Sequence, residues 1–236
     1  MINSVYDSDH YDELAWLIAK RVPGFAIKYK DESRWQRFLG CLCFFNKKYM
    51  TKYTNTFGKT VWFPSRKFVE RNKWAAFKIL AHEYVHLLDR MKARLFFEIS
   101  YAFPQFVFML SLLALLSIWF SFGWLFSLLS LLFLLPIPAV FRAAIEMRGY
   151  SMNIAINIWR HGSLREDTRE WITEAFTGWP YYKMWPFPSV IRGWIADTER
   201  RVYNIDAVKI DPEDVIINDS EAFVDVYALV TGIEFD

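Results

Sequence analysis

The chain has 236 residues and a formal net charge of +2, and 54% of its residues are hydrophobic and 19% aromatic. This length suits one domain, with or without an insertion, and provides enough apolar residues for a sizeable core. The nearly balanced charge argues against a nucleic-acid binder, because such proteins carry a strong positive field. The first residues are polar and acidic, so we predict no signal peptide.

The N-terminal part of the chain predicts both helices and strands. An amphipathic helix is expected over 9–21, and a long helix from Asn72 to about residue 95 has apolar side chains three and four residues apart. The strand over Thr60, Val61, Trp62 and Phe63 is followed by Pro64, which cannot continue a central ladder, so we predict an edge strand there. Short strands are expected over 25–29, 40–45 and 60–63.

No charged residue occurs from Phe106 to Leu135, and Ser121-Phe122-Gly123 interrupts this stretch. Two helices of about 17 residues would each be about 25 Å long, slightly short of the roughly 30 Å hydrocarbon core of a bilayer. We therefore expect a membrane-type helical hairpin in a thinned bilayer or a re-entrant pair. Basic residues on both flanks predict that the rest of the protein lies on the cytoplasmic side. The alternative is a hairpin buried within a soluble or assembled protein.

The C-terminal part predicts further helices over 141–160, 163–177, 190–203 and 220–230. We accordingly divide the chain into an N-terminal part (1–103), the hydrophobic hairpin (104–140) and a C-terminal helical part (141–236).

Residues 82–86, His-Glu-Tyr-Val-His, fall inside the predicted helix that begins at Asn72. His82 and His86 are four residues apart, so they project from one face of a helix and can both reach one Zn²⁺. Glu83 would lie beside the water-occupied position and act as a general base. The alternative is a helix with two histidines that make ordinary hydrogen bonds.

A zinc site needs a third ligand, and Glu146 is our candidate. It lies on the first helix after the hairpin, where Gly149 and two alanines would allow close approach to a neighbouring helix. The alternative is a surface glutamate that pairs with Arg142. Asp89 either accepts a hydrogen bond that orients one histidine or forms a salt bridge with a nearby arginine or lysine.

Together these features resemble the gluzincins, and in layout the HtpX-like membrane zinc endopeptidases. In that family a helix carries HExxH, a pair of hydrophobic segments follows, and a later helix supplies a glutamate ligand. His82-Glu83-Tyr84-Val85-His86, the stretch 106–135 and Glu146 have this order. The resemblance covers roughly residues 56–160.

The resemblance implies an α+β, zincin-like fold with a small antiparallel or mixed sheet and an inserted hydrophobic hairpin. It also implies that His82, His86 and Glu146 hold Zn²⁺, that Glu83 is the general base, and that an extended peptide pairs with the strand 60–63. The family usually has an aspartate where this chain has Tyr150, so Asp89 would take over its role. Tyr150 and His161 are candidates to stabilise the oxyanion, with packing in a helix and a helix C-terminal cap as their respective alternatives.

We therefore expect a membrane-associated, zinc-dependent metalloendopeptidase acting on a protein or peptide. The alternative is a non-catalytic protein whose zincin scaffold holds a structural metal ion or none. In that case the hairpin would drive docking to a membrane, or assembly into an oligomer or a larger particle.

Overall fold

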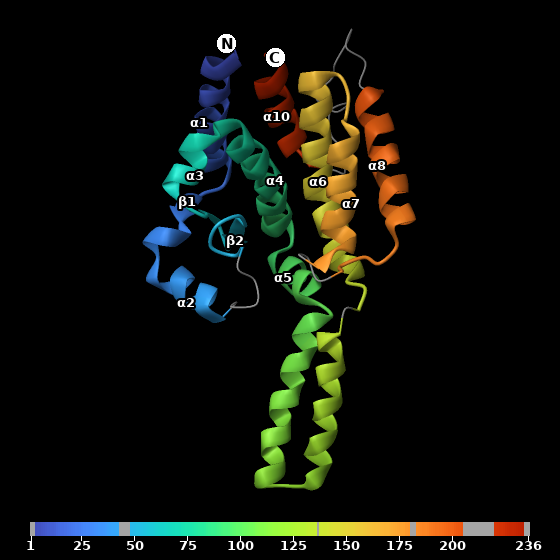
Figure 1. Cartoon of the computed structure of the whole chain (residues 1–236). Coiled ribbons are helices and arrows are strands. Elements are labelled where there is room, and N and C mark those ends of the chain that lie inside the picture. The colour runs from blue at the N-terminus through green and yellow to red at the C-terminus, as the bar shows by residue number, and fades with distance from the viewer. Residues whose placement is uncertain (1–2, 43–47, 136, 180–182, 205–219, 234–236) are drawn as a thin grey trace.

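The computed structural model describes residues 3–42, 48–135, 137–179, 183–204 and 220–233. Within these ranges the chain is mostly helical (Figure 1). Two long helices, α4 (Lys73–Lys92) and α6 (Val140–His161), lie side by side in the middle of the molecule. Helices α1 (Asn3–Arg21) and α10 (Ala222–Thr231) lie at one end, and a helical hairpin projects from the other.

The remaining helices pack around this central pair. Helix α1 packs on α4, and α10 contacts α1, α4 and α6. On the other side of α6, α8 (Pro188–Tyr203) packs against both α6 and α7 (Glu166–Thr177). The buried side chains recur at three- and four-residue spacing, as expected for helices with one apolar face; they include Leu14, Ile18, Phe77, Leu80, Tyr84, Ile154 and Ile158.

A small sheet flanks α4 with the strand order β1-β3-β2. Strand β1 (Ala26–Tyr29) pairs in parallel with β3 (Thr60–Phe63), and β2 (Asn55–Phe57) pairs antiparallel with β3. Gly58 has a φ of +60° and begins the two-residue turn between β2 and β3, where a glycine is the residue best suited to a positive φ. Three short helices complete this part, namely η1 (Lys30–Glu32), α2 (Arg34–Leu42) and α3 (Arg66–Arg71).

The prediction that 60–63 is an edge strand is wrong, because β3 lies between β1 and β2. Pro64 follows Phe63, the last paired residue of β3, so its missing N–H does not interrupt the ladder. The open edge on this side of the sheet belongs to β2, which the sequence analysis did not predict.

The predicted α+β, zincin-like fold is also wrong, since helices dominate and the sheet has only three short strands among the described residues. Residues 40–42 of the predicted strand 40–45 belong to α2, and residues 43–47 lie outside the described ranges. The long helix ends at Lys92, and a separate helix, α5 (Arg94–Ala102), follows. A short apolar run fits a helix face as well as a strand, and residues 40–42 form the end of a helix.

The uncharged stretch forms two 3-10 helices, η2 (Gln105–Ile118) and η3 (Phe122–Leu134), which lie side by side (Figure 1). Among the described residues, no helix is both long enough and apolar enough to cross a membrane. The prediction of a membrane-type hairpin, and with it membrane association and a cytoplasmic-side location, is therefore wrong. The break at 119–121 divides the run into helices of 14 and 13 residues, whereas a spanning helix needs roughly 20.

Because η2 and η3 pack mainly on each other, replacing residues 106–135 with a short Gly-Ser linker should leave the rest of the chain folded. The melting temperature should stay within about 4 °C of the wild type, which corresponds to about 1 kcal/mol for a chain of this size. Binding of a hydrophobic dye should fall, because many exposed apolar side chains are removed. Circular dichroism during heating measures the first effect, and loss of cooperative unfolding would contradict it.

Candidate metal centre

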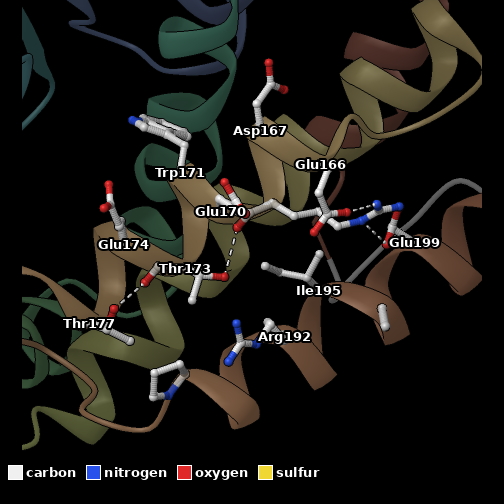
Figure 2. A pocket seen from close by; sticks show the side chains of 13 residues that line it. Glu166, Asp167, Glu170, Trp171, Thr173, Glu174, Thr177, Arg192, Ile195 and Glu199 are labelled. Carbon is white, nitrogen blue, oxygen red and sulfur yellow. Dashed lines mark hydrogen bonds and ion pairs between the residues drawn. The ribbon is translucent and has the colours of Figure 1, made fainter.

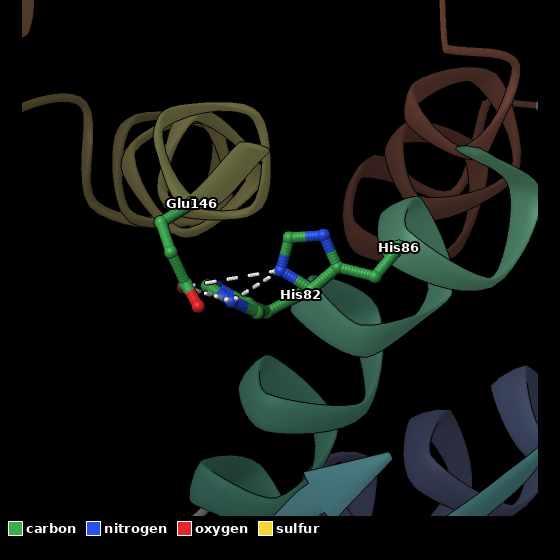
Figure 3. A group of neighbouring side chains, drawn as sticks. All are labelled: His82, His86 and Glu146. Carbon is green, nitrogen blue, oxygen red and sulfur yellow. Dashed lines mark hydrogen bonds and ion pairs between the residues drawn. The ribbon is translucent and has the colours of Figure 1, made fainter. Parts of the chain in front are cut away.

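The candidate site lies between α4 and α6, at a point where the two helices approach closely. His82 and His86 are one turn apart on α4 and face Glu146 on α6 (Figure 3). A Cβ atom at Gly149 would lie 2.6 Å from the Cε1 and Nε2 atoms of His82, which no real side chain would allow. The glycine therefore lets the His82 ring lie directly against the backbone of α6, in agreement with the close approach that the sequence predicts.

Three side chains converge on one point. The Nε2 atoms of His82 and His86 are 3.0 Å apart, and one oxygen of Glu146 lies 3.4 Å from the first and 3.9 Å from the second. His86 and Glu146 are buried, with 5% and 3% of their surface exposed. One atom from each residue lies within 4.8 Å of the other two, so this group could hold a metal ion.

Glu83 lies beside this group without belonging to it. The hydroxyl of Thr56, on β2, donates a hydrogen bond of 2.7 Å to the Oε2 atom of Glu83. Burial raises the pKa of Glu83 above its ordinary value, and the nearby charge of Glu146 acts in the same direction, whereas His82 and Thr56 oppose it. A raised pKa brings a carboxylate closer to the range in which it can accept and return a proton near neutral pH.

The protonation of the three candidate ligands is uneven. Burial and the charge of His82 lower the pKa of His86 to about 3, so that this imidazole is neutral. Burial also opposes a proton on His82, but the hydrogen bond with Glu146 and the charges of Glu146 and Glu83 raise its pKa. For Glu146, burial is outweighed by the hydrogen bond with His82 and by the neighbouring histidines, and its pKa falls to about 2. The surroundings of His82 thus favour a proton that balances the charge of Glu146.

Glu146 is held from outside the ligand group by α5. The hydroxyl of Tyr101 donates a hydrogen bond of 2.6 Å to the Oε1 atom of Glu146, which leaves Oε2 as the oxygen nearer the histidines. The guanidinium of Arg142 lies over the Tyr101 ring, 4.9 Å from its centre. This arrangement fixes the carboxylate in the orientation that a metal ligand needs.

Asp89 does not contact a histidine. Its two oxygens accept hydrogen bonds of 2.7 and 2.8 Å from Arg148, which is the salt bridge considered as the alternative role. Because Asp89 is on α4 and Arg148 is on α6, this two-bond pair ties together the helices that carry the ligands.

The two candidates for oxyanion stabilisation occupy different places. Tyr150 is buried, and its ring meets the His82 ring edge-on with centres 4.9 Å apart, so it supports the ligand by packing. His161 is the exposed last residue of α6. Fifteen residues of helix separate it from Glu146, which is about 22 Å, so it does not belong to this site.

Two cavities meet at the site. One of about 630 Å³ and one of about 370 Å³ share Tyr53, Thr54, His82 and Glu83 in their walls. The larger extends toward Trp171 on α7, and the smaller toward Tyr101 and Arg142. Strand β2 lines the smaller cavity, and the segment just before it lines both. Residues Thr60, Val61, Trp62 and Phe63, predicted to line the substrate site, line neither cavity.

A third cavity, of about 580 Å³, lies between α7 and α8 (Figure 2). Arg169 holds the carboxylates of Glu166 and Glu199 there. None of the candidate ligands lines this cavity.

Three residues that contact the site were not found in the sequence analysis, namely Thr56, Tyr101 and Asn153. Asn153 lies seven residues after Glu146, so helical spacing alone places it on the same face of α6. Thr56 and Tyr101 come from other elements, and only their tertiary contacts identify them.

Comparisons with protein-family profiles, with curated proteins and with solved structures give no match to this chain. The resemblance to HtpX-like endopeptidases therefore stays a prediction from the order of motifs.

Gly149→Ala should displace the His82 ring, because the added Cβ would overlap it. We expect a loss of metal affinity and a loss of about 1–3 kcal/mol in the free energy of unfolding, the usual cost of overpacking. Gly193→Ala, on α8 with no atom within 4 Å of the added Cβ, is the matched control and should stabilise the helix by about 0.5–1 kcal/mol. Equal metal affinities of the two variants would contradict the close approach.

Metal binding should depend on pH through the proton on His82. Because the pKa of His82 is raised while those of His86 and Glu146 are low, the proton on His82 is the one that has to leave when the metal ion binds. Apparent affinity should fall by about tenfold for each pH unit below the pKa of His82 and level off above it. Calorimetry in two buffers with different heats of ionisation measures the number of protons released on metal binding. If no proton is released, the assignment of this proton to His82 is wrong.

Proposed function

We propose that the chain is a zinc-dependent metallopeptidase that cleaves peptide bonds within a protein or peptide substrate. The observation that carries the proposal is the convergence of His82, His86 and Glu146 next to a fourth residue, Glu83, that lines the smaller cavity with all three without joining the ligand group. A metal site with a purely structural role does not require a carboxylate, such as that of Glu83, that lies beside the ligands without being one of them. The proposal rests on the site and not on a zincin fold.

The spacing of the donor atoms favours zinc. Ligands bound at about 2.0–2.1 Å in a tetrahedral arrangement lie about 3.3 Å from one another, and the three distances here are 3.0, 3.4 and 3.9 Å. Two imidazoles and one carboxylate leave a fourth position open, as in catalytic zinc sites. The same donors can hold Fe²⁺ in oxygenases, but that chemistry does not need a base at the position of Glu83.

Held by His82, His86 and Glu146, Zn²⁺ would supply a Lewis acid that lowers the pKa of a water molecule and polarises the substrate carbonyl. Glu83 accepts the proton as the water attacks the carbonyl carbon, and returns it to the amine nitrogen as the C–N bond breaks. Thr56 holds Glu83 by one oxygen during both transfers. Tyr101 keeps Glu146 turned toward the histidines.

The open edge of β2 is the surface that would hold the substrate. Phe57 and Thr60 flank the two-residue turn and face each other across the ladder, so alternation directs the main-chain N–H and C=O of Thr56 to the open edge. An extended peptide added there would pass beside Glu83. The cavities on both sides of Glu83 offer space for residues before and after the cleaved bond, which supports an endopeptidase.

Glu83→Gln should keep the metal ion and the fold and lose peptidase activity by about a hundred- to ten-thousand-fold, the usual contribution of a general base. Glu146→Ala should lose both metal and activity, because only two imidazoles remain. Zinc content per chain and cleavage of a fluorescently labelled unfolded protein are the two measurements. Glu70→Gln, an exposed glutamate on α3, is the control and should change neither.

If Glu83→Gln and Glu146→Ala both keep zinc and the wild-type rate, the roles assigned to these two residues fail, whereas zinc binding without any cleavage by the wild type would favour a non-catalytic protein. If Glu146→Ala alone keeps zinc, the third ligand has been misassigned. Iron in place of zinc in purified protein would contradict the hydrolytic proposal.

A further inference from the structure

Asn153 lies against the side of the His82 ring that faces away from the ligand group. Its Nδ2 atom is 3.2 Å from the Nδ1 atom of His82. Its Oδ1 atom is buried and has no hydrogen-bond partner within the part of the chain that the structure describes. An asparagine amide can turn by 180° without changing its shape, exchanging its donor NH₂ and its acceptor oxygen. The same contact can therefore be made in two ways.

The two orientations of the amide select different forms of His82. When Nδ2 donates, Nδ1 accepts, and the proton of a neutral imidazole must sit on Nε2. That atom faces His86 and Glu146, so this form has no lone pair for a metal ion. When Oδ1 faces the ring, Nδ1–H donates to it and Nε2 presents its lone pair to the site.

Packing fixes the position of the His82 ring. What remains undetermined is which of its two nitrogens carries the proton. The ring lies between the backbone of Gly149 and the edge of Tyr150. His86 differs, because its buried Nδ1 atom has no hydrogen-bond partner among the described residues. The hydrogen bonds of Asp89 go to Arg148, whereas the side chain next to the Nδ1 atom of His82 is Asn153.

We infer that Asn153 is a positioning residue whose side-chain oxygen accepts the Nδ1–H of His82 and so presents Nε2 to the metal ion. The inference rests on the proposed metal-binding function of His82, His86 and Glu146. The rival acceptor for His82 is the carbonyl of Gly149, which also interacts with its ring. Substitutions at position 153 separate the two, because they leave the backbone of Gly149 in place.

Two substitutions change the hydrogen-bond acceptor at position 153 and nearly keep the shape of the side chain. Asn153→Asp offers only acceptor oxygens, and Asn153→Leu offers none. We expect Asn153→Leu to weaken Zn²⁺ binding by about ten- to a hundredfold, the usual effect of losing the outer partner of a ligating histidine. Asn153→Asp should bind Zn²⁺ at least as tightly as the wild type. Competition with a chromophoric chelator measures the dissociation constants in the full chain.

The control is Asn157→Leu, one turn further along α6, where the asparagine donates to the main-chain oxygen of Asn153. Its Zn²⁺ affinity should equal that of the wild type. If Asn153→Leu does not fold, as judged by circular dichroism, Asn153→Ala takes its place with the same expected loss.

Nitrogen-15 spectra of the histidine rings in metal-free protein give a second readout. At a pH where His82 is neutral, Asn153→Asp should shift it toward the Nδ1–H form, and Asn153→Leu should remove that preference. Unchanged Zn²⁺ affinity and an unchanged ring form in Asn153→Leu would overturn the inference and point to Gly149. If the wild type binds no metal, the proposed function falls, while the ring spectra still decide the role of Asn153.

Discussion

The contact between His82 and the backbone of α6 at Gly149 determines the geometry of the whole site. An imidazole occupies the space that any other residue at position 149 would fill with its Cβ. The Asp89–Arg148 pair ties the same two helices together, and the Tyr150 ring supports the imidazole from the side. Because helices packed this closely cannot slide without a clash, Glu146 is held opposite the two histidines.

A second set of contacts, made by Lys30, positions strand β2 next to this helix pair. Lys30 is fully buried, and its ammonium group donates hydrogen bonds to the main-chain oxygens of Tyr49 and Tyr53 and to the side-chain oxygen of Asn55. A buried charge is stable only when it is satisfied in this way. These bonds fix the segment that leads into β2, and through β2 they fix Thr56 against Glu83. The candidate metal ligands and the proposed general base, Glu83, thus depend on contacts with different parts of the chain.

Local spacing predicted those features that depend only on the geometry of one helix. Two histidines four residues apart share a face whatever surrounds them, and the glycine after Glu146 indicated where another helix could approach. The fold class was predicted wrongly because the order of motifs does not determine how the rest of the chain folds, and the strand 40–45 was predicted because a short apolar run fits two structures. The edge strand was also wrong, because only the pairing of β3 on both sides identifies it as central. The partner of Asp89, and the roles of Tyr101 and Thr56, depend on contacts between distant segments that no local pattern contains.

The hairpin interrupts the chain between two elements that both contribute to the site. Tyr101 lies just before the hairpin and Glu146 soon after it. The rings of Phe103 and Phe141 pack together at the base of the hairpin, with their centres 6.1 Å apart. These contacts hold the two ends of the insertion close together. Since the entropic cost of closing a loop grows only slowly with its length, a long apolar segment can be inserted there at little further cost. The hydrogen bond between Tyr101 and Glu146 therefore links the two ends of the insertion at the candidate metal site.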